Sequence, residues 1–272
     1  MKHLTITGGL GFIGKNYYLS IKDNWDKIVI IDKKTYAADY KYFLSIKRDV
    51  DELLIGDITD QKFLEQHIKS GSTIVHFAAE SHVDKSFKTS VIFSLTNTYG
   101  THLLLDICRF KDINKIIIIS TDEVYGESVL PCSETSRMSP SNPYSASKSG
   151  ADLIAQSYYK SFKLPIIIVR PNNIYGKRQN AEKIIPAIIR AVNGGKKLNI
   201  HGKGETSRFF LHVNDFCRAL NLILEKGSNG DIFNVNGSYK IKIIELINHA
   251  AAYKKIKINS FSEFIESFLK QF

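Results

Sequence analysis

The chain has 272 residues, 43% of them hydrophobic, which is enough for one large domain or a large domain with a small satellite. No apolar run reaches the roughly 18 to 20 residues that cross a bilayer, and no secretory pattern opens the sequence, so we expect a cytoplasmic protein without a membrane segment. The net charge of +10 suits an anionic partner. Its even spread along the chain favours a phosphorylated small molecule over nucleic acid.

The first predicted strand, Leu4–Ile6, leads into a glycine-rich turn and a helical stretch that ends near Ser20. Glycines spaced three residues apart permit a tight turn, close approach of the backbone to a pyrophosphate, and close packing of helix on strand. The N–H groups that open the helix attract phosphate. The segment therefore predicts a dinucleotide site formed by Gly8, Gly11, Phe12, Ile13 and Gly14.

A second strand over Lys27–Ile31 ends in Asp32. An acid at this point accepts hydrogen bonds from the adenosine ribose hydroxyls and repels a 2′-phosphate, so we expect NAD rather than NADP. A third strand, Glu52–Ile55, leads to a turn that places Asp57 and Ile58 to reach the adenine edge.

The fourth predicted strand, Ser72–Phe77, is followed by Ala78 and Ala79, small residues that let a backbone pass close to a cofactor. Next comes His82, a candidate ligand contact whose alternative is an exposed loop histidine. A helix is predicted over residues 91–110. The three cysteines, Cys108, Cys132 and Cys217, are too widely scattered to predict a disulfide framework or a metal site.

The most apolar run of the chain, Lys115–Ser120, predicts a central parallel strand buried on both faces. Ligand crevices of open α/β sheets lie at the carboxyl ends of such strands. We therefore expect Asp122 and Glu123, which follow this strand, in the site. Residues 126–143 have no periodicity and predict a loop that forms part of the site wall.

A long helical pattern follows to Phe162, and near its start Tyr144 and Lys148 lie four residues apart, on one helix face. A nearby ammonium favours a phenolate, so we expect Lys148 to lower the pKa of Tyr144. With the hydroxyl of Ser120 or Thr121, the pair forms the set that hydride-transfer enzymes use. The adjacent carboxyls add an acid and a base for a further elimination step.

Strands that alternate with helices predict an α/β fold: a Rossmann-type doubly wound parallel sheet with a small C-terminal substrate-binding lobe. The NAD-binding domain is predicted over residues 1–170, with residues 205–236 returning to it. The lobe is predicted over residues 171–204 and 237–272. Further elements are expected at 165–170 (strand), 183–194 (helix), 208–213 (strand), 215–225 (helix) and 231–235 (strand).

Four segments resemble the extended short-chain dehydrogenase/reductases, and within them the nucleotide-sugar 4,6-dehydratases that act on dTDP-glucose or UDP-glucose. These segments are Thr7–Gly14, Ala78–Asp84, Ser120–Gly126 and Tyr144–Lys148. The resemblance covers residues 3 to about 236, and the Thr-Asp-Glu string is its most specific part. It implies a lyase of deoxysugar (for example rhamnose) biosynthesis, with bound NAD, that forms a 4-keto-6-deoxy sugar nucleotide.

The resemblance also implies residue roles. Thr121 and Tyr144 serve the 4-hydroxyl of the sugar, with Lys148 supporting the tyrosinate, while Asp122 is the acid for the 6-hydroxyl and Glu123 the base at carbon 5. The nucleoside-diphosphate sugar is expected to be held by Ser81, His82, Asn173, Glu182, Lys183 and Arg208.

Departures from the family pattern occur at Asn180–Ala181 and at Leu198–Asn199, so dTDP and UDP both stay open as the nucleotide. The family's C-terminal stretch, which carries a further arginine near the diphosphate, has no recognisable match after Asn236. We therefore expect weaker substrate affinity.

Two other functions stay open. One is an NAD-dependent nucleotide-sugar epimerase, which needs no Asp122–Glu123 pair. The other is a non-catalytic NAD-binding or nucleic-acid-binding protein on the same fold, against which the full set of catalytic residue types argues. The apolar helices near residues 91–110 and 144–162 predict a homodimer through a four-helix interface.

Overall fold

The structure, a computed structural model, describes residues 2–127, 131–193, 198 and 200–255. Of the positions singled out above, Asn199 and the last residues of the predicted lobe, 256–272, lie outside the described residues. The chain forms two compact units: a first unit of residues 1–171 and 217–235, and a second unit of residues 172–216 and 236–272. No helix within the described ranges has the length and apolar character needed to cross a membrane.

The first unit is built on a seven-stranded sheet in the order β3-β2-β1-β4-β5-β6-β9, with every neighbouring pair parallel. The strands are β1 (His3–Thr7), β2 (Lys27–Asp32), β3 (Glu52–Ile55), β4 (Ser72–His76), β5 (Lys115–Ile119), β6 (Ile166–Pro171) and β9 (Ile232–Val235). The chain order reverses between β1 and β4. In open α/β sheets this switch point is where ligands bind.

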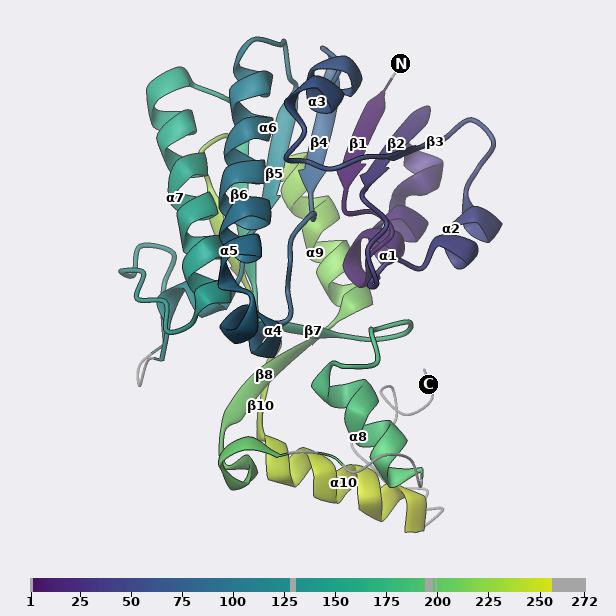
Figure 1. Cartoon of the computed structure of the whole chain (residues 1–272), viewed down its shortest axis with the longest axis vertical. Coiled ribbons are helices and arrows are strands. Elements are labelled where there is room, and N and C mark those ends of the chain that lie inside the picture. Colours follow the sequence, from purple (N-terminus) through teal and green to yellow (C-terminus); the bar gives the residue numbers. More distant parts are fainter. Residues whose placement is uncertain (1, 128–130, 194–197, 199, 256–272) are drawn as a thin grey trace. The chain divides into compact units, whose positions relative to one another are not determined.

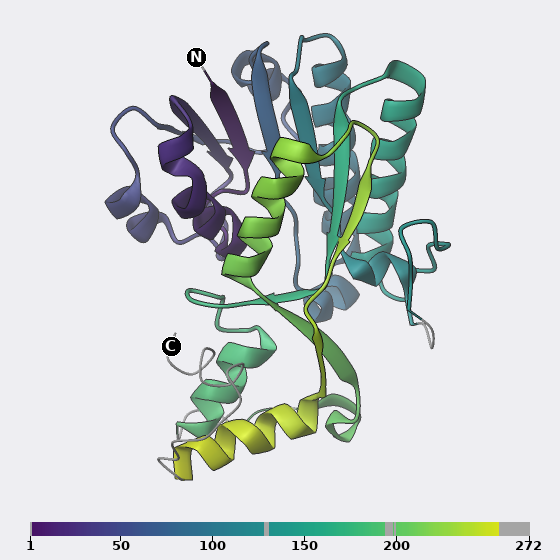
Figure 2. The same ribbon diagram turned by 180° about the vertical axis from the view of Figure 1, so that it is seen from behind.

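Helices cover both faces of this sheet, which confirms the predicted doubly wound fold. They are α1 (Phe12–Ile21), α2 (Tyr40–Ile46), α3 (Gln61–His67), α4 (Val83–Lys88), α5 (Ser90–Phe93), α6 (Gly100–Arg109), α7 (Pro143–Phe162) and α9 (Val213–Lys226), with the short helices η1 (Lys22–Asn24), η2 (Ser94–Tyr99) and η3 (Asp122–Tyr125). Figure 1 shows α3, α6 and α7 in front of the sheet. Figure 2, seen from behind, shows α1 and α9 on the opposite face.

The core of the first unit is rich in isoleucine. The central strands β4 and β6 are buried along their whole length, and β5 is buried from Ile116 onward. On the α6–α7 face, Ile116 and Ile118 pack with Leu104 and Ala155. Burial of each such large aliphatic side chain stabilises the fold by about 1.5–3 kcal/mol. The apolar run is therefore the central strand that its composition predicts.

Helix α7 begins at a reciprocal cap. The Asn142 side chain accepts a hydrogen bond from Ser145 N at 2.9 Å, the Ser145 hydroxyl accepts one from Asn142 N at 3.2 Å, and Pro143 occupies the first turn. A cap of this kind stabilises a helix by about 1 kcal/mol. It fixes where the helix starts, one residue before Tyr144.

The single helix predicted over residues 91–110 is instead made of three parts, α5, η2 and α6, and η2 is π-helical. A π-helical turn holds one residue more than an α-helical turn and is often found at functional sites. Here Asn97 is fully buried, and Thr98 donates a hydrogen bond to Ser147 O at 2.8 Å. These polar contacts with neighbouring elements accompany the change of helix type, and the apolar periodicity of the sequence does not reveal it.

The second unit has its own three-stranded sheet in the order β10-β8-β7. Its elements are β7 (Asn173–Tyr175), α8 (Ile184–Val192), η4 (His201–Gly204), β8 (Ser207–His212), β10 (Tyr239–Lys242) and α10 (Ile243–Lys255). Residues 205–216, assigned above to the NAD-binding domain, lie in this unit. The reason is that β8 pairs with β7 on one side and with β10 on the other.

Candidate active site

The glycine-rich turn after β1 has the close packing that a dinucleotide loop needs. Gly8 has a φ of 70°, and a Cβ atom there would lie 2.6 Å from Ala78 N. A Cβ atom on Gly14 would lie 2.4 Å from Gly8 O. Gly11 precedes α1 and provides no side-chain cap for the helix, whose first turn holds Phe12 and Ile13. The opening N–H groups of this helix therefore suit a phosphate.

Asp32 joins this loop to the end of β2. Its carboxylate accepts hydrogen bonds from Leu10 N at 3.0 Å and from Lys34 N at 2.8 Å, and burial raises its pKa. Nearby, Asp57 accepts a hydrogen bond from Thr59 N at 3.0 Å, and its carboxylate lies 3.6 Å from Lys33 Nζ. Ile58 is 4% exposed. The loop and these acids fit the adenosine end of a dinucleotide.

A buried chain of hydrogen bonds lies beneath the loop and was not predicted. His76 Nδ1 lies 2.7 Å from Thr7 Oγ1, and its Nε2 lies 2.9 Å from Thr101 Oγ1. The Thr101 hydroxyl donates to Asn97 O at 2.6 Å, so it accepts from His76 Nε2–H, and Thr7 donates to Nδ1. Burial and the charge of Lys148 lower the pKa of His76 to about 3, which keeps the ring neutral. This hydroxyl–imidazole chain ties the end of β1 to the end of β4, next to Ala78 and Ala79.

Two hydroxyl side chains, Ser120 and Thr121, follow β5, and Thr121 is the one that contacts Tyr144. Thr121 is hydrogen-bonded to the Tyr144 phenol, and it also caps η3 by accepting from Glu123 N at 3.3 Å. The Ser120 hydroxyl is buried and has no partner among the described residues. The hydroxyl–tyrosine–lysine set is therefore Thr121, Tyr144 and Lys148.

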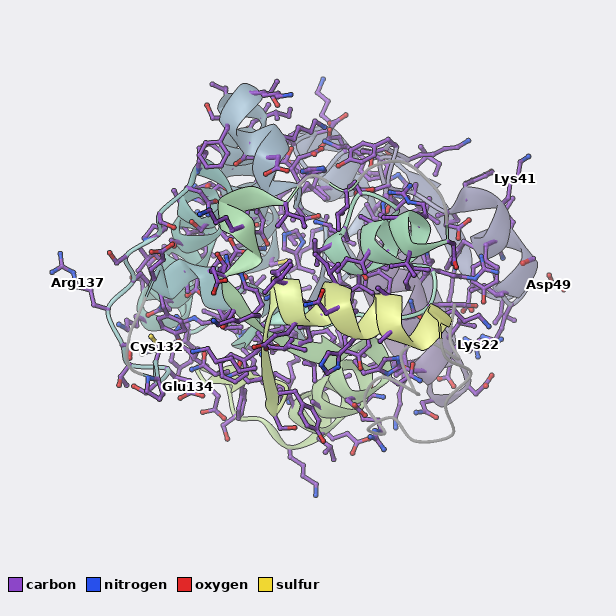
Figure 3. The ribbon with its side chains drawn as sticks, turned by 90° about the horizontal axis from the view of Figure 1, so that it is seen from below. Lys22, Lys41, Asp49, Cys132, Glu134 and Arg137 are labelled. Atoms are coloured by element: carbon purple, nitrogen blue, oxygen red, sulfur yellow. The ribbon has the colours of Figure 1, made fainter. Side chains whose placement is uncertain are left out.

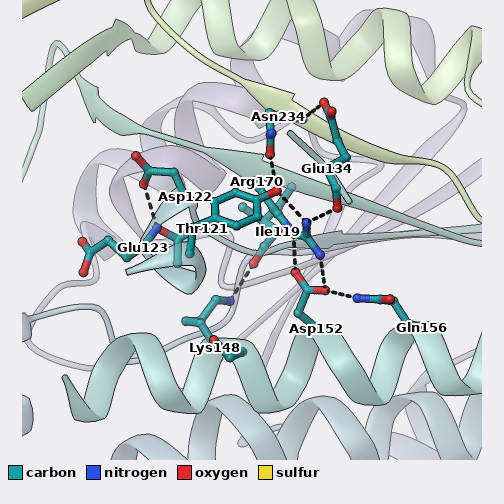
Figure 4. A network of polar contacts seen from close by, with 12 residues as sticks. Ile119, Thr121, Asp122, Glu123, Glu134, Lys148, Asp152, Gln156, Arg170 and Asn234 are labelled. Carbon is teal, nitrogen blue, oxygen red and sulfur yellow. Dashed lines mark hydrogen bonds and ion pairs between the residues drawn. The ribbon is translucent and has the colours of Figure 1, made fainter. Parts of the chain in front are cut away.

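The expected effect of Lys148 on Tyr144 is wrong. Burial, and then the negative charges of Glu123 and Asp122, raise the pKa of Tyr144 above its ordinary value, although the hydrogen bond from Thr121 opposes this. Lys148 donates its own hydrogen bond to Ile119 O at 2.6 Å, and burial lowers its pKa to about 8. The lysine shares a helix face with the tyrosine, but its ammonium is directed to the end of β5 (Figure 4).

The acidic pair directly follows Thr121, the partner of this tyrosine, and the negative charges of both carboxylates raise the Tyr144 pKa. Asp122 and Glu123 are partly exposed and belong to η3. Glu123 Oε2 accepts a long hydrogen bond, 3.4 Å, from Asn142 Nδ2. The structure thus brings together all five predicted catalytic residues in the first unit. Such a group can take a proton from a sugar hydroxyl and also carry out acid–base chemistry beside it.

Asn97 is a further site residue that the sequence analysis missed. Its side chain accepts from Glu80 N at 2.8 Å and donates to Glu80 O and to Ser147 Oγ, both at 2.9 Å. Ser147 in turn donates to Tyr144 O at 2.7 Å. The contacts link the loop after β4 to the first turn of α7. The polar run Thr96–Thr98 in the predicted helix over residues 91–110 was the available signal.

The predicted substrate-binding residues are divided between the units. In the first unit Ser81 is exposed and His82 precedes α4. In the second unit Asn173 donates to Phe209 O at 3.2 Å, Lys183 precedes α8, and Glu182 and Arg208 are exposed. Their roles stay predictions.

The strand order and the Thr121–Tyr144–Lys148 set are those of a short-chain dehydrogenase/reductase, and comparison with known proteins narrows this class. A family model described as GDP-mannose 4,6 dehydratase matches residues 5–267. The chain therefore belongs to the nucleotide-sugar 4,6-dehydratase family. The match extends well past Asn236, so the absence of a recognisable C-terminal match, expected above, is corrected.

Several curated relatives carry dehydratase names, including one from Dictyostelium discoideum and one from Arabidopsis thaliana. A dTDP-D-glucose 4,6-dehydratase of Dictyostelium discoideum is 39% identical over 263 residues, which are 90% of this chain and 61% of the relative. A trifunctional UDP-glucose 4,6-dehydratase of Arabidopsis thaliana is 37% identical over 261 residues, 90% of this chain and 38% of the relative. The chain thus spans less than two thirds of the length of either relative.

A solved structure shares the fold. The dTDP-glucose 4,6-dehydratase DesIV from Streptomyces venezuelae, solved with NAD and TYD bound, superimposes with a TM-score of 0.90 at 32% identity. The superposition covers 93% of this chain and 81% of that one.

Proposed function

We propose that the protein is an NAD-dependent dehydratase that converts a nucleoside-diphosphate glucose, with dTDP or UDP as the nucleotide, into its 4-keto-6-deoxy form. The observation that carries the proposal is the acidic pair beside Tyr144, since hydride transfer alone needs neither carboxyl. The relatives that carry dehydratase names support it.

Bound NAD would supply a hydride acceptor for carbon 4 and return that hydride to carbon 6. The residues that would hold it are the glycine loop, Asp32, Ala78 and Lys148. Tyr144, assisted by Thr121, takes the proton of the 4-hydroxyl as the ketone forms. The proton on carbon 5, now acidified by the ketone, goes to Glu123, and Asp122 protonates the 6-hydroxyl, which leaves as water. As the hydride reaches carbon 6, Glu123 returns its proton to carbon 5, and the proton that Tyr144 took offsets the one that Asp122 gave.

The proposal is tested by incubating the purified protein, supplied with NAD, with dTDP-glucose and UDP-glucose separately. Loss of one water from either sugar nucleotide, followed by mass, supports the dehydratase and identifies the nucleotide. If neither sugar nucleotide loses water, the proposal is overturned.

One variant separates the dehydratase from the epimerase. Asp122→Asn cannot protonate the leaving hydroxyl, so we expect product formation to fall by roughly 100-fold or more, within the range that a general acid contributes. Asp106→Asn, a substitution on α6 outside the site, is the control. Full activity in Asp122→Asn, with a sugar epimer as the product, would favour the epimerase.

We also infer that two copies of the chain pair through α5–η2–α6 and α7. These helices lie side by side in Figure 1. They expose large apolar side chains at Val91 (79%), Leu95 (43%), Tyr99 (47%) and Leu153 (54%). Sedimentation should give a dimer at micromolar concentration, and Leu153→Glu should shift it to monomer. A monomeric mass for the parent protein would contradict the inference.

A further inference from the structure

The turn that carries Asp122 and Glu123 is fixed at its backbone. Gly126 ends the turn with a φ of 72°, where a Cβ atom would lie 1.9 Å from Ser139 O. Ser139 N also donates to Val124 O at 3.0 Å. The Asp122 carboxylate accepts a hydrogen bond from the Thr121 hydroxyl at 3.3 Å, and the Glu123 carboxylate accepts one from Asn142 Nδ2 at 3.4 Å. The backbone of this turn therefore sets where both carboxylates lie.

Tyr125, the last residue of this turn, anchors it in the protein interior. Its side chain is 6% exposed. The hydroxyl accepts a 2.6 Å hydrogen bond from Arg170 Nη1 and donates a 2.8 Å bond to Asn234 Oδ1. The guanidinium also lies against the Tyr125 ring, 5.1 Å from its centre. One hydroxyl thus connects η3 to β6 and β9.

The guanidinium of Arg170 also holds α7, the helix that carries Tyr144 and Lys148. Arg170 is 1% exposed and makes two 2.9 Å hydrogen bonds to the carboxylate of Asp152, which is fully buried on α7 (Figure 4). Asp152 lies one helical turn after Lys148, and its charge raises the pKa of that lysine against the effect of burial. Arg170 therefore sets the position of the acidic turn relative to the helix of Tyr144 and Lys148.

The loop between η3 and α7 closes the same network. Glu134 O accepts from Arg170 Nη1 at 3.0 Å, and the Glu134 carboxylate accepts from Asn234 N at 2.9 Å. Asn234 Nδ2 donates to Cys132 O at 3.2 Å. Figure 3 shows Cys132 and Glu134 on this loop, with the Arg137 side chain extending away from the ribbon. The polar network around Arg170 thus joins five separate chain segments: η3, the loop that follows it, α7, β6 and β9.

We propose that Tyr125, acting through its hydroxyl, is a positioning residue for the elimination step of the reaction. This rests on the proposed function. The hydroxyl holds the turn of Asp122 and Glu123 at a fixed distance from α7. Elimination requires this placement, because a misplacement of about 1 Å can reduce a rate by roughly 100-fold. Hydride transfer from carbon 4 depends on Thr121, Tyr144 and Lys148. Tyr144 and Lys148 are held by α7. The backbone next to Thr121 is held by the hydrogen bond from Ser120 N to Val169 O on β6, at 2.7 Å.

The test is Tyr125→Phe, which keeps the ring and removes the hydroxyl. Two rates are measured: reduction of bound NAD by a nucleoside-diphosphate 6-deoxyglucose, which has no 6-hydroxyl to lose, and water loss from the full substrate. We expect the first rate to stay within about 2-fold of the parent and the second to fall roughly 10-fold or more.

Tyr158→Phe is the matched control. Tyr158 is 7% exposed on α7, and its hydroxyl is bonded to Asp106 and His102, away from the turn. This variant should leave both rates unchanged. Equal loss of both rates in Tyr125→Phe, or no loss of either, overturns the positioning role while the parent's product upholds the dehydratase. A parent that yields no product from either sugar nucleotide overturns the proposed function, and the positioning role with it.

Discussion

Two buried polar networks support the site of the first unit, and they differ in charge. Beneath the glycine loop, Thr7, His76 and Thr101 form a neutral chain in which each group has one donor role and one acceptor role. Beneath the acidic turn, Arg170 and Asp152 form an ion pair with almost no exposed surface. Both networks join elements that are distant in sequence at the carboxyl end of the sheet.

The difference bears on what each network tolerates. A neutral chain loses hydrogen bonds when a member is removed, at about 1–3 kcal/mol for each buried group left unpaired. An ion pair that loses one member leaves a buried charge, which costs more. Removal of one member should therefore destabilise the protein less in the network beneath the glycine loop than in the network beneath the acidic turn.

The largest effect is expected at the ion pair. Arg170→Met leaves the Asp152 carboxylate buried without its partner, and we expect the free energy of unfolding to fall by about 3–5 kcal/mol. Urea denaturation measures this. The double variant Arg170→Met with Asp152→Leu, which removes both charges, should recover most of the loss. A single-variant loss below about 1 kcal/mol would show that the pair is not effectively buried.

A smaller effect is expected from protonation of the neutral chain. The pKa of His76 is lowered to about 3 from its ordinary value of 6.5. Between these values the unfolded chain binds a proton that the folded chain does not, so stability falls as the pH falls through this window. We expect His76 to account for about 2 kcal/mol of the stability lost between pH 7 and pH 5.

Urea midpoints at the two pH values test this, with His76→Asn as the variant and His67→Asn, at the end of α3, as the control. The variant should be less stable at pH 7 and should lose less stability on acidification. An identical acid response in parent and His76→Asn would contradict the assignment.

The smallest effect is expected at a surface pair on the same sheet. Lys27 Nζ and the Glu52 carboxylate lie 3.0 Å apart between β2 and β3, and both side chains are at least 40% exposed. Lys27→Ala should change the free energy of unfolding by less than about 1 kcal/mol. A loss as large as that of Arg170→Met would remove the distinction drawn here between buried and exposed pairs.

The features that the sequence predicted most accurately are those that depend on short local patterns. The glycine spacing, the isoleucine run before Ser120, and Tyr144 with Lys148 on one helix are local features, and the structure shows each element where it was expected. The Arg170–Asp152 and Tyr125–Asn234 contacts join residues 18 and 109 positions apart. Nothing in the local pattern reveals such contacts, because each of these residues reads alone as an ordinary strand or helix position.

The predictions for the pKa of Tyr144 and for the unit that holds β8 were wrong for a related reason. Helical spacing shows that Lys148 shares a face with the tyrosine, but not that its ammonium bonds to Ile119 O. The strand near residue 208 was expected correctly, while its pairing with β7 and β10 depends on partners that the strand's own sequence does not specify.

The position of β9 in the chain has a consequence for synthesis. The first unit is interrupted after Pro171 and resumes only at Cys217, and β9 then pairs with β6. A nascent chain that has reached Pro171 carries six of the seven strands, with the backbone edge of β6 still unpaired and able to attract another chain. Tyr125 at that stage lacks its acceptor on Asn234. Translation must therefore pass through most of the second unit before the first can close its sheet, and during that interval the chain is most open to misassembly.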